Sequence, residues 1–158
     1  MTFEHGAKKF RTLFISDVHL GARGCQADQL LDFLRYNDAD TIYLVGDIVD
    51  GWQLKSGWYW PQDHNDVVQK LLRKARKGAR VVYLPGNHDE FLRDYYGTHF
   101  GGIEVVETAI HEMDDVRPGH TLAGPAVLEA ESTTFPIPPD RSAVLDEHGI
   151  FHLETKEA

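Results

Sequence analysis

Residues that could bind a metal ion follow three short apolar runs in the N-terminal two thirds of the chain. They stand in the stretches SDVHLG, GDIVDG and GNHDE and are Asp17, His19, Asp47, Asp50, Asn87, His88 and Asp89. Carboxylate and amide oxygens mixed with imidazole nitrogens suit a hard or borderline divalent ion such as Mn²⁺, Fe²⁺ or Zn²⁺. The set contains no cysteine, which argues against a structural zinc site. The three stretches together predict a divalent metal site.

Each stretch alone also has a plainer interpretation. Asp17 and His19 could belong to an ordinary loop, Gly46 and Asp47 could form a turn after a strand, and His88 could be a hydrogen-bonded loop histidine. The ordered recurrence of the stretches, one β-α unit apart, favours the metal site. Asp17 and His19 are two residues apart and would share one side of an extended chain.

Apolar segments alternate with helical patterns up to about residue 112. We expect strands over 12–16, 41–46, 80–86 and 103–108, and helices over 27–36, from an N-cap at Asn65 to Gly78, and over 90–96. Continuously apolar strands separated by helices are typical of a parallel sheet buried on both faces, which indicates the α/β class. Ligands of such sheets bind beyond the carboxyl ends of the strands, where the three stretches stand. Asp89 is expected to cap the helix that follows it.

Several aromatic residues follow the second stretch in a segment expected to be a loop: Trp52, Trp58, Tyr59 and Trp60. They could pack against a neighbouring helix, or they could form an apolar wall that accepts an acyl or nucleoside group beside a phosphate site. Arg23 could reach a phosphate or could be an ordinary exposed loop arginine. Both pairs of alternatives stay open.

Composition limits the partners and the compartment. The 158 residues carry a formal net charge of −9, which argues against binding nucleic acid through its phosphates. Anionic membranes are disfavoured for the same reason, and peripheral membrane contact stays an open alternative. The single cysteine, Cys25, cannot form an internal disulfide, and no apolar run approaches the length of a signal peptide or a membrane span. We therefore expect a cytoplasmic protein without a membrane span.

The three stretches, in this order and spacing, resemble the first three motifs of the calcineurin-like metallophosphoesterase superfamily, over about residues 9 to 112. The surrounding sequence, including VGDIVDGWQL, WYWPQ and YLPGNHDEFLRDY, resembles the UDP-2,3-diacylglucosamine diphosphatase-like branch, which acts in lipid A synthesis. The resemblance implies a dimetal site, with Mn²⁺ as the expected ion. Asp17 and His19 would bind the first ion, Asp47 would bridge both, and Asn87 would bind the second.

The same resemblance implies a catalytic role for two further residues. His88 would lie near the scissile phosphate as electrostatic stabiliser or proton donor, and Asp50 would orient it. The expected substrate is a phosphorylated small molecule or a lipid-linked nucleotide, cleaved at a phosphate ester or pyrophosphate. The expected fold is part of the sandwich of this superfamily.

The sequence departs from the superfamily pattern downstream. Two later histidine motifs complete both metal shells in that superfamily, and here GHT at Gly119 to Thr121 has Leu122 in place of the second histidine. One hypothesis is a hydrolase in which His148 or His152 replaces a lost ligand. The alternative is a catalytically inactive remnant or fusion that binds at most one metal ion weakly.

The last part of the chain has a different character. It contains Pro and Thr and short β-like runs, with DEHG as a hairpin turn between SAVL and IFHL. Residues 116 to 154 resemble the C-terminal segment of the hydantoinase A and acetone carboxylase family. We predict an N-terminal metallophosphoesterase part over 1–112 and a β-rich tail of different origin over 113–158.

Overall fold

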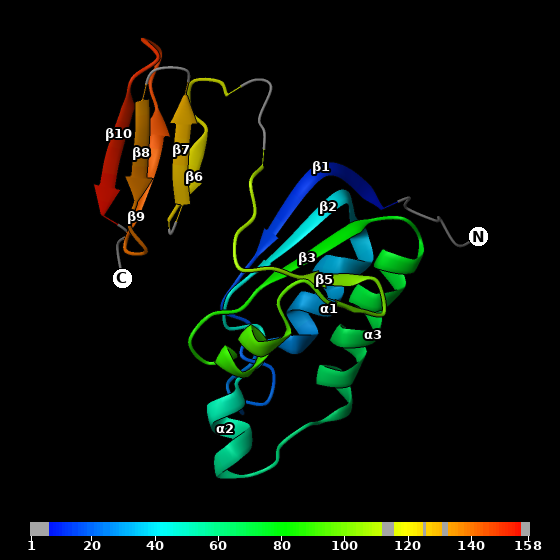
Figure 1. Ribbon diagram of the computed structural model, residues 1–158. Coiled ribbons are helices and arrows are strands. Elements are labelled where there is room, and N and C mark those ends of the chain that lie inside the picture. Colours follow the sequence, from blue (N-terminus) through cyan, green and yellow to red (C-terminus); the bar gives the residue numbers. More distant parts are fainter. Residues whose placement is uncertain (1–6, 112–115, 125, 131–132, 156–158) are drawn as a thin grey trace, which may run out of the picture. The chain divides into compact units, whose positions relative to one another are not determined.

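The computed structural model describes residues 7–111, 116–124, 126–130 and 133–155 (Figure 1). Contacts divide the chain into two compact units, Met1–Ile110 and His111–Ala158. The first unit contains the three polar stretches. No helix in the described ranges has the length and apolar character needed to cross a membrane.

A mostly parallel sheet forms the centre of the first unit. Its order is β1 (Lys8–Ile15), β2 (Asn37–Val45), β3 (Arg80–Leu84), β5 (Ile103–Val105) and β4 (His99–Phe100), and only β4 is antiparallel to its neighbour. Ile15 pairs with Leu44, and Val45 pairs with Leu84, so the carboxyl ends of β1, β2 and β3 lie at one edge. The predicted α/β class is confirmed, while the short hairpin of β4 and β5 was not anticipated.

Two helices cover one face of this sheet. Figure 1 shows α1 (Ala27–Tyr36) and α3 (Gln62–Arg76) side by side along it. Leu34 of α1 and Val67 and Leu71 of α3 are buried with sheet residues in one apolar core. Burial of these side chains is the main favourable term in folding the unit and fixes the strand ends in place.

Several predicted boundaries were wrong. The third helix begins at Gln62 after Pro61, so Asn65 is not its N-cap. A short helix, α2 (Gly51–Ser56), occupies part of the segment expected to be a loop, because the Asp50 side chain accepts the Gln53 backbone N–H at 2.9 Å and caps it. The predicted helix over 90–96 is the 3₁₀ helix η1 (Glu90–Tyr95), and β5 is shorter than the expected strand.

The second unit is built of antiparallel strands. They are β6 (Thr121–Ala123), β7 (Ala126–Ala130), β8 (Thr133–Ile137), β9 (Arg141–Leu145) and β10 (Phe151–Thr155). One sheet has the order β10-β9-β6 and the other pairs β7 with β8. The predicted β-rich tail is confirmed, as is its hairpin, in which Leu145 pairs with Phe151.

Asp146 organises the turn of this hairpin. Its side chain accepts the backbone N–H groups of His148 at 2.9 Å and Ile150 at 2.8 Å, and His152 Nε2 lies 2.6 Å from its second oxygen. The contact with His152, together with the Ile150 and His148 amides, lowers the pKa of the Asp146 carboxyl. His152 therefore has a carboxylate partner within its own unit.

We predict that the β9–β10 hairpin loses order in acid because of Asp146. A group whose pKa is lower in the folded state contributes stability above its unfolded pKa, and that contribution disappears as the pH falls through the folded pKa. Protection of the β9 and β10 amides from hydrogen exchange should thus fall from about pH 5 towards pH 2, and Asp146→Asn should be less protected at pH 5 and nearly independent of pH. Glu147→Gln, an exposed change in the same turn, should behave like the natural chain; equal acid loss in Asp146→Asn would contradict the prediction.

Candidate metal centre at the carboxyl edge of the sheet

Backbone hydrogen bonds join the three polar stretches beyond the ends of their strands. Asp17 N–H donates to the Gly46 carbonyl at 3.2 Å, and His19 N–H donates to the Asp47 carbonyl at 2.9 Å. The His88 N–H in turn donates to Asp47 Oδ1 at 2.9 Å. The three loops therefore form one hydrogen-bonded layer, with Asp47 in contact with both of its neighbours.

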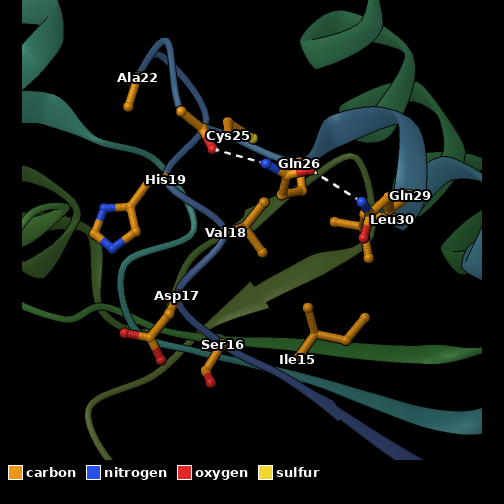
Figure 2. Close-up of a pocket in the computed structure, with 11 residues that line it drawn as sticks. Ile15, Ser16, Asp17, Val18, His19, Ala22, Cys25, Gln26, Gln29 and Leu30 are labelled. Carbon is orange, nitrogen blue, oxygen red and sulfur yellow. Dashed lines mark hydrogen bonds between the residues drawn. The ribbon is translucent and has the colours of Figure 1, made fainter. Parts of the chain in front are cut away.

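Three candidate metal ligands have left-handed backbone conformations. The φ angles are 53° at Asp17, 55° at His19 and 53° at Asp47, and among the described residues these are the non-glycine positions with positive φ. Such conformations cost free energy and persist where surrounding structure holds them, often at functional sites. The extended chain assumed for Asp17 and His19 is therefore wrong, although Figure 2 shows the two side chains projecting to the same side, away from Val18.

The strand ends bring carboxylates and imidazoles together in two overlapping groups. Asp17, His19 and Asp47 each offer one ligand atom within 4.8 Å of the others. His19 also belongs to a second group, with Asp50 and His88, whose ligand atoms lie within 4.8 Å of one another. These distances are compatible with a shared cation, and they bring the SDVHLG and GDIVDG stretches to one site.

Asn87 lies on the third loop, where it is exposed. The loop reaches Asp47 because Gly86 precedes Asn87: a Cβ atom at Gly86 would lie 2.4 Å from Asp47 Oδ1. A larger residue would push the loop away from the carboxylate. A glycine is therefore required for steric reasons at this position of the GNHDE stretch, because the third loop lies close to Asp47.

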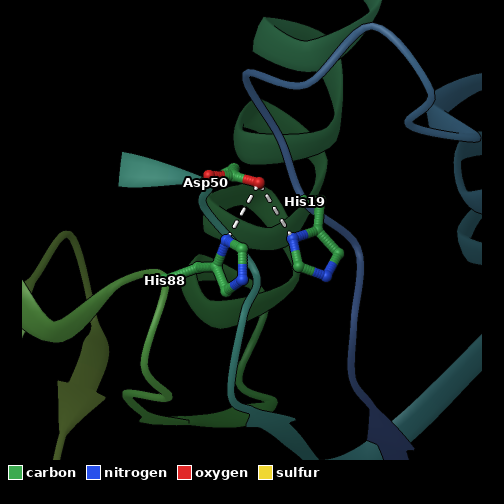
Figure 3. A group of neighbouring side chains, drawn as sticks. All are labelled: His19, Asp50 and His88. Atoms are coloured by element: carbon green, nitrogen blue, oxygen red, sulfur yellow. Dashed lines mark hydrogen bonds and ion pairs between the residues drawn. The ribbon is translucent and has the colours of Figure 1, made fainter. Parts of the chain in front are cut away.

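Asp50 is shared by two histidines. Its Oδ2 lies 3.1 Å from His19 Nδ1 and 3.1 Å from His88 Nδ1, as Figure 3 shows. Burial disfavours the charge of this carboxylate, but the Gln53 amide and the two histidines outweigh that effect and lower the pKa of Asp50. The Asp50 contact conversely raises the pKa of His88 against the effect of burial. A carboxylate on one imidazole nitrogen fixes the ring and leaves the other nitrogen to act.

Aromatic contacts further restrict the His88 ring. The Trp52 ring centroid lies 4.1 Å from that of His88, and the His19 ring meets His88 edge to face at 4.7 Å. The Trp52 contact has no signal in the sequence, because it depends on the helix α2, which the sequence pattern did not indicate. The aromatic residues that follow the second polar stretch differ in burial: Trp60 packs against the core, whereas Trp58 is 78% exposed.

Asp89 is a further residue whose role was predicted wrongly. Its side chain is fully buried and makes no hydrogen bond that caps η1. It instead accepts the N–H of Ile48 at 2.9 Å, the N–H of Asp47 at 3.3 Å, the N–H of Gly86 at 2.5 Å and the hydroxyl of Tyr83 at 2.5 Å. Burial and the negative Asp89 raise the pKa of Tyr83, which keeps its hydroxyl a donor. Asp89 thus ties the loop after β3 to the loop after β2.

Known proteins resemble the two parts of the chain separately. UDP-2,3-diacylglucosamine hydrolase of Xanthomonas campestris pv. campestris is 36% identical over 94 residues, covering 57% of this chain and 37% of that protein. The enzyme of the same name from Porphyromonas gingivalis is 30% identical over 97 residues, covering 56% of this chain and 36% of that protein. The first part of the chain is therefore similar to UDP-2,3-diacylglucosamine hydrolases and spans little more than a third of their length.

The second part resembles a different family. The model of the hydantoinase/oxoprolinase C-terminal domain matches residues 93–156. The acetone carboxylase beta subunit of Xanthobacter autotrophicus is 42% identical over 48 residues, covering 30% of this chain and 7% of that protein. The family match begins at residue 93, inside the first unit, and not at residue 116 as expected. No solved structure matches the chain.

We predict that Asp89→Asn destabilises the first unit by about 2 kcal/mol, because an amide nitrogen would face buried N–H donors that now share a carboxylate. Chemical denaturation followed by circular dichroism measures the change. Asp94→Asn, an exposed change in the neighbouring 3₁₀ helix, is the matched control and should be neutral. Equal stability of Asp89→Asn and the natural chain would show that the hydrogen bonds to Asp89 do not hold the loops.

Proposed function

We propose that the chain is a metal-dependent phosphoesterase or pyrophosphatase of the UDP-2,3-diacylglucosamine hydrolase kind. The observation that carries the proposal is the pair of overlapping groups at the sheet edge: Asp17, His19 and Asp47 within 4.8 Å, and His19, Asp50 and His88 beside them. The similarity of the first part to proteins of that name supports the choice of reaction.

The donor set fits a divalent ion. Asp17, His19 and Asp47 would hold the first, and Asp47 with the Asn87 amide oxygen would take part in holding a second, with Mn²⁺ as the proposed ion. Oxygen donors with one imidazole suit Mn²⁺ better than they suit a structural zinc. Ions bound there would supply positive charge to phosphoryl oxygens and lower the pKa of a bound water.

Residues of the chain itself would stabilise and protonate the leaving group. Asp50 faces His88 Nδ1, so Nε2 is the His88 atom that can meet a substrate oxygen. The raised pKa of His88 favours the protonated ring, which can stabilise a phosphate and donate its proton to the departing oxygen. The Trp52 ring packed on His88 limits rotation of the imidazole during that transfer.

The proposed substrate is a phosphate ester or pyrophosphate, with a lipid-linked sugar nucleotide as the first compound to assay. The similar proteins are named UDP-2,3-diacylglucosamine hydrolase, which supports this choice. A role in lipid A synthesis follows from the same choice.

A one-metal protein of low activity is the second candidate. It is favoured by the ligand groups themselves: among the described residues, Asp17, His19 and Asp47 form a group of three that could hold one ion, and the other group, His19, Asp50 and His88, does not contain Asp47. A second ion would then have Asp47 and Asn87 as its proposed ligands. Two protein ligands hold a divalent ion weakly. Such a protein would bind one Mn²⁺ ion and hydrolyse slowly.

We predict that Asp47→Ala abolishes Mn²⁺ binding, because its carboxylate serves both proposed positions. His88→Gln should retain Mn²⁺ binding and lose hydrolysis by about 100-fold or more, as expected for a lost general acid. Calorimetric titration with Mn²⁺ and assays on bis(p-nitrophenyl) phosphate and UDP-2,3-diacylglucosamine measure both effects. Asp66→Ala, an exposed change on α3, is the control and should alter neither.

Asn87→Ala separates the two candidates. In a dimetal enzyme it should remove one bound ion and most of the turnover, and in a one-metal protein it should change neither by much. Unchanged Mn²⁺ binding in Asp47→Ala would contradict both candidates, because each depends on that carboxylate.

A further inference from the structure

A groove of about 510 Å³ lies in the first unit, outside the groups of candidate metal ligands. Residues 21–24, which follow His19, form one wall. Gln53 and Ser56 of α2 and residues 57–59 form the other. Both walls are direct continuations of loops that carry site residues, since α2 begins just after Asp50.

The groove is built on a buried histidine. His64 Nδ1 accepts the Gly21 N–H at 2.9 Å, which anchors the first wall to α3. The Tyr59 and Trp60 rings contact His64 edge to face at 5.7 and 5.8 Å, which anchors the second wall to the same side chain. The first wall also packs tightly on α2, because a Cβ atom at Gly21 would lie 2.7 Å from Leu54. The two walls are therefore held in a fixed relation.

The groove presents a cation without a carboxylate partner. Arg23 is exposed, and its guanidinium carbon lies 4.6 Å from the centre of the Tyr59 ring. Neither aspartate nor glutamate lines the groove, and within the described part of the chain Arg23 makes no ion pair. In a chain of net charge −9, a guanidinium stacked on an aromatic ring and free of carboxylates is suited to a phosphate.

An exposed indole stands in the same groove. Trp58 is 78% exposed, and its ring lies 6.2 Å from that of Trp60, which packs against the core. One exposed aromatic residue is ordinary on a protein surface. Its combination with Arg23 in one polar groove indicates a ligand that carries both a flat ring and a negative charge, because indole faces stack on bases and guanidinium groups bind phosphates.

We propose that this groove binds the nucleotide part of the substrate, with the base stacked on Trp58 and a phosphate on Arg23. The proposal rests on the proposed function for the choice of uridine, since the similar proteins are named for a UDP-linked compound. It assigns Arg23 and Trp58 to substrate selection and leaves the reacting phosphate to the loops of His19, Asp47 and His88.

The test is calorimetric titration of the full chain with UMP, uridine and inorganic phosphate in the presence of EDTA. UMP should bind at least about tenfold more tightly than either fragment, because it makes both contacts. Arg23→Gln should weaken UMP by about tenfold and leave uridine unchanged, whereas Trp58→Ala should weaken UMP and uridine by about tenfold. Both side chains are exposed, so the variants should keep the thermal unfolding midpoint of the natural chain.

Arg35→Gln and Tyr36→Ala are the matched controls, because both side chains are exposed on α1. Each should bind UMP as the natural chain does. The proposal is overturned if UMP binds no better than uridine or phosphate, or if the controls lose as much affinity as Arg23→Gln and Trp58→Ala. UMP binding without metal does not depend on hydrolysis, so the two proposals can fail separately. A chain that binds UMP but does not hydrolyse the substrate would support the nucleotide groove and contradict the proposed function.

Discussion

The buried Asp89 carboxylate is the interaction on which the arrangement of the candidate site depends. Its oxygens accept backbone N–H groups from the loop after β2 and from the start of its own loop, together with the Tyr83 hydroxyl at the end of β3. The amides of Asp47, Ile48 and Gly86 lie beyond the ends of β2 and β3, outside the hydrogen-bonded ladder, and a buried amide without a partner is costly. One ionised side chain satisfies several of these donors at once. Asp47 and His88 are consequently held at a fixed separation before any ligand arrives.

Much of the first unit could be predicted from sequence, because it rests on periodicity and on chain order. Apolar runs separated by helical patterns indicated the parallel sheet, and the alignment of carboxyl ends then required the polar stretches to meet at one edge. Asp17, His19 and Asp47 are indeed brought together there. The hairpin of the tail could also be predicted, because its two strands are adjacent in the chain and DEHG between them is a local turn signal.

Other features could not be predicted, because they depend on contacts between segments distant in sequence. The role of Asp89 was predicted wrongly because an aspartate before a helical pattern can either cap the helix or accept hydrogen bonds from distant amides. Only the packing of the loops decides between these two roles. The contact between Trp52 and His88 required α2, whose six residues are too few to show a helical period. The left-handed conformations of Asp17, His19 and Asp47 have no sequence signal beyond tolerance of that region by Asp and His.

The left-handed conformations of Asp17, His19 and Asp47 and the charges around them both lower the stability of the chain without a bound ion. Asp17 and Asp47 place two carboxylate oxygens within 4.8 Å of each other, on residues whose φ angles already cost free energy. Like charges so close disfavour the folded arrangement unless a cation compensates them. His88, held near Asp50 with a raised pKa, supplies part of that compensation at the neighbouring group. The rest of the negative charge is left for a bound cation to compensate. The geometry that lowers the stability of the free chain would therefore give a divalent ion its affinity. An ion that binds only the folded state would in turn stabilise that state.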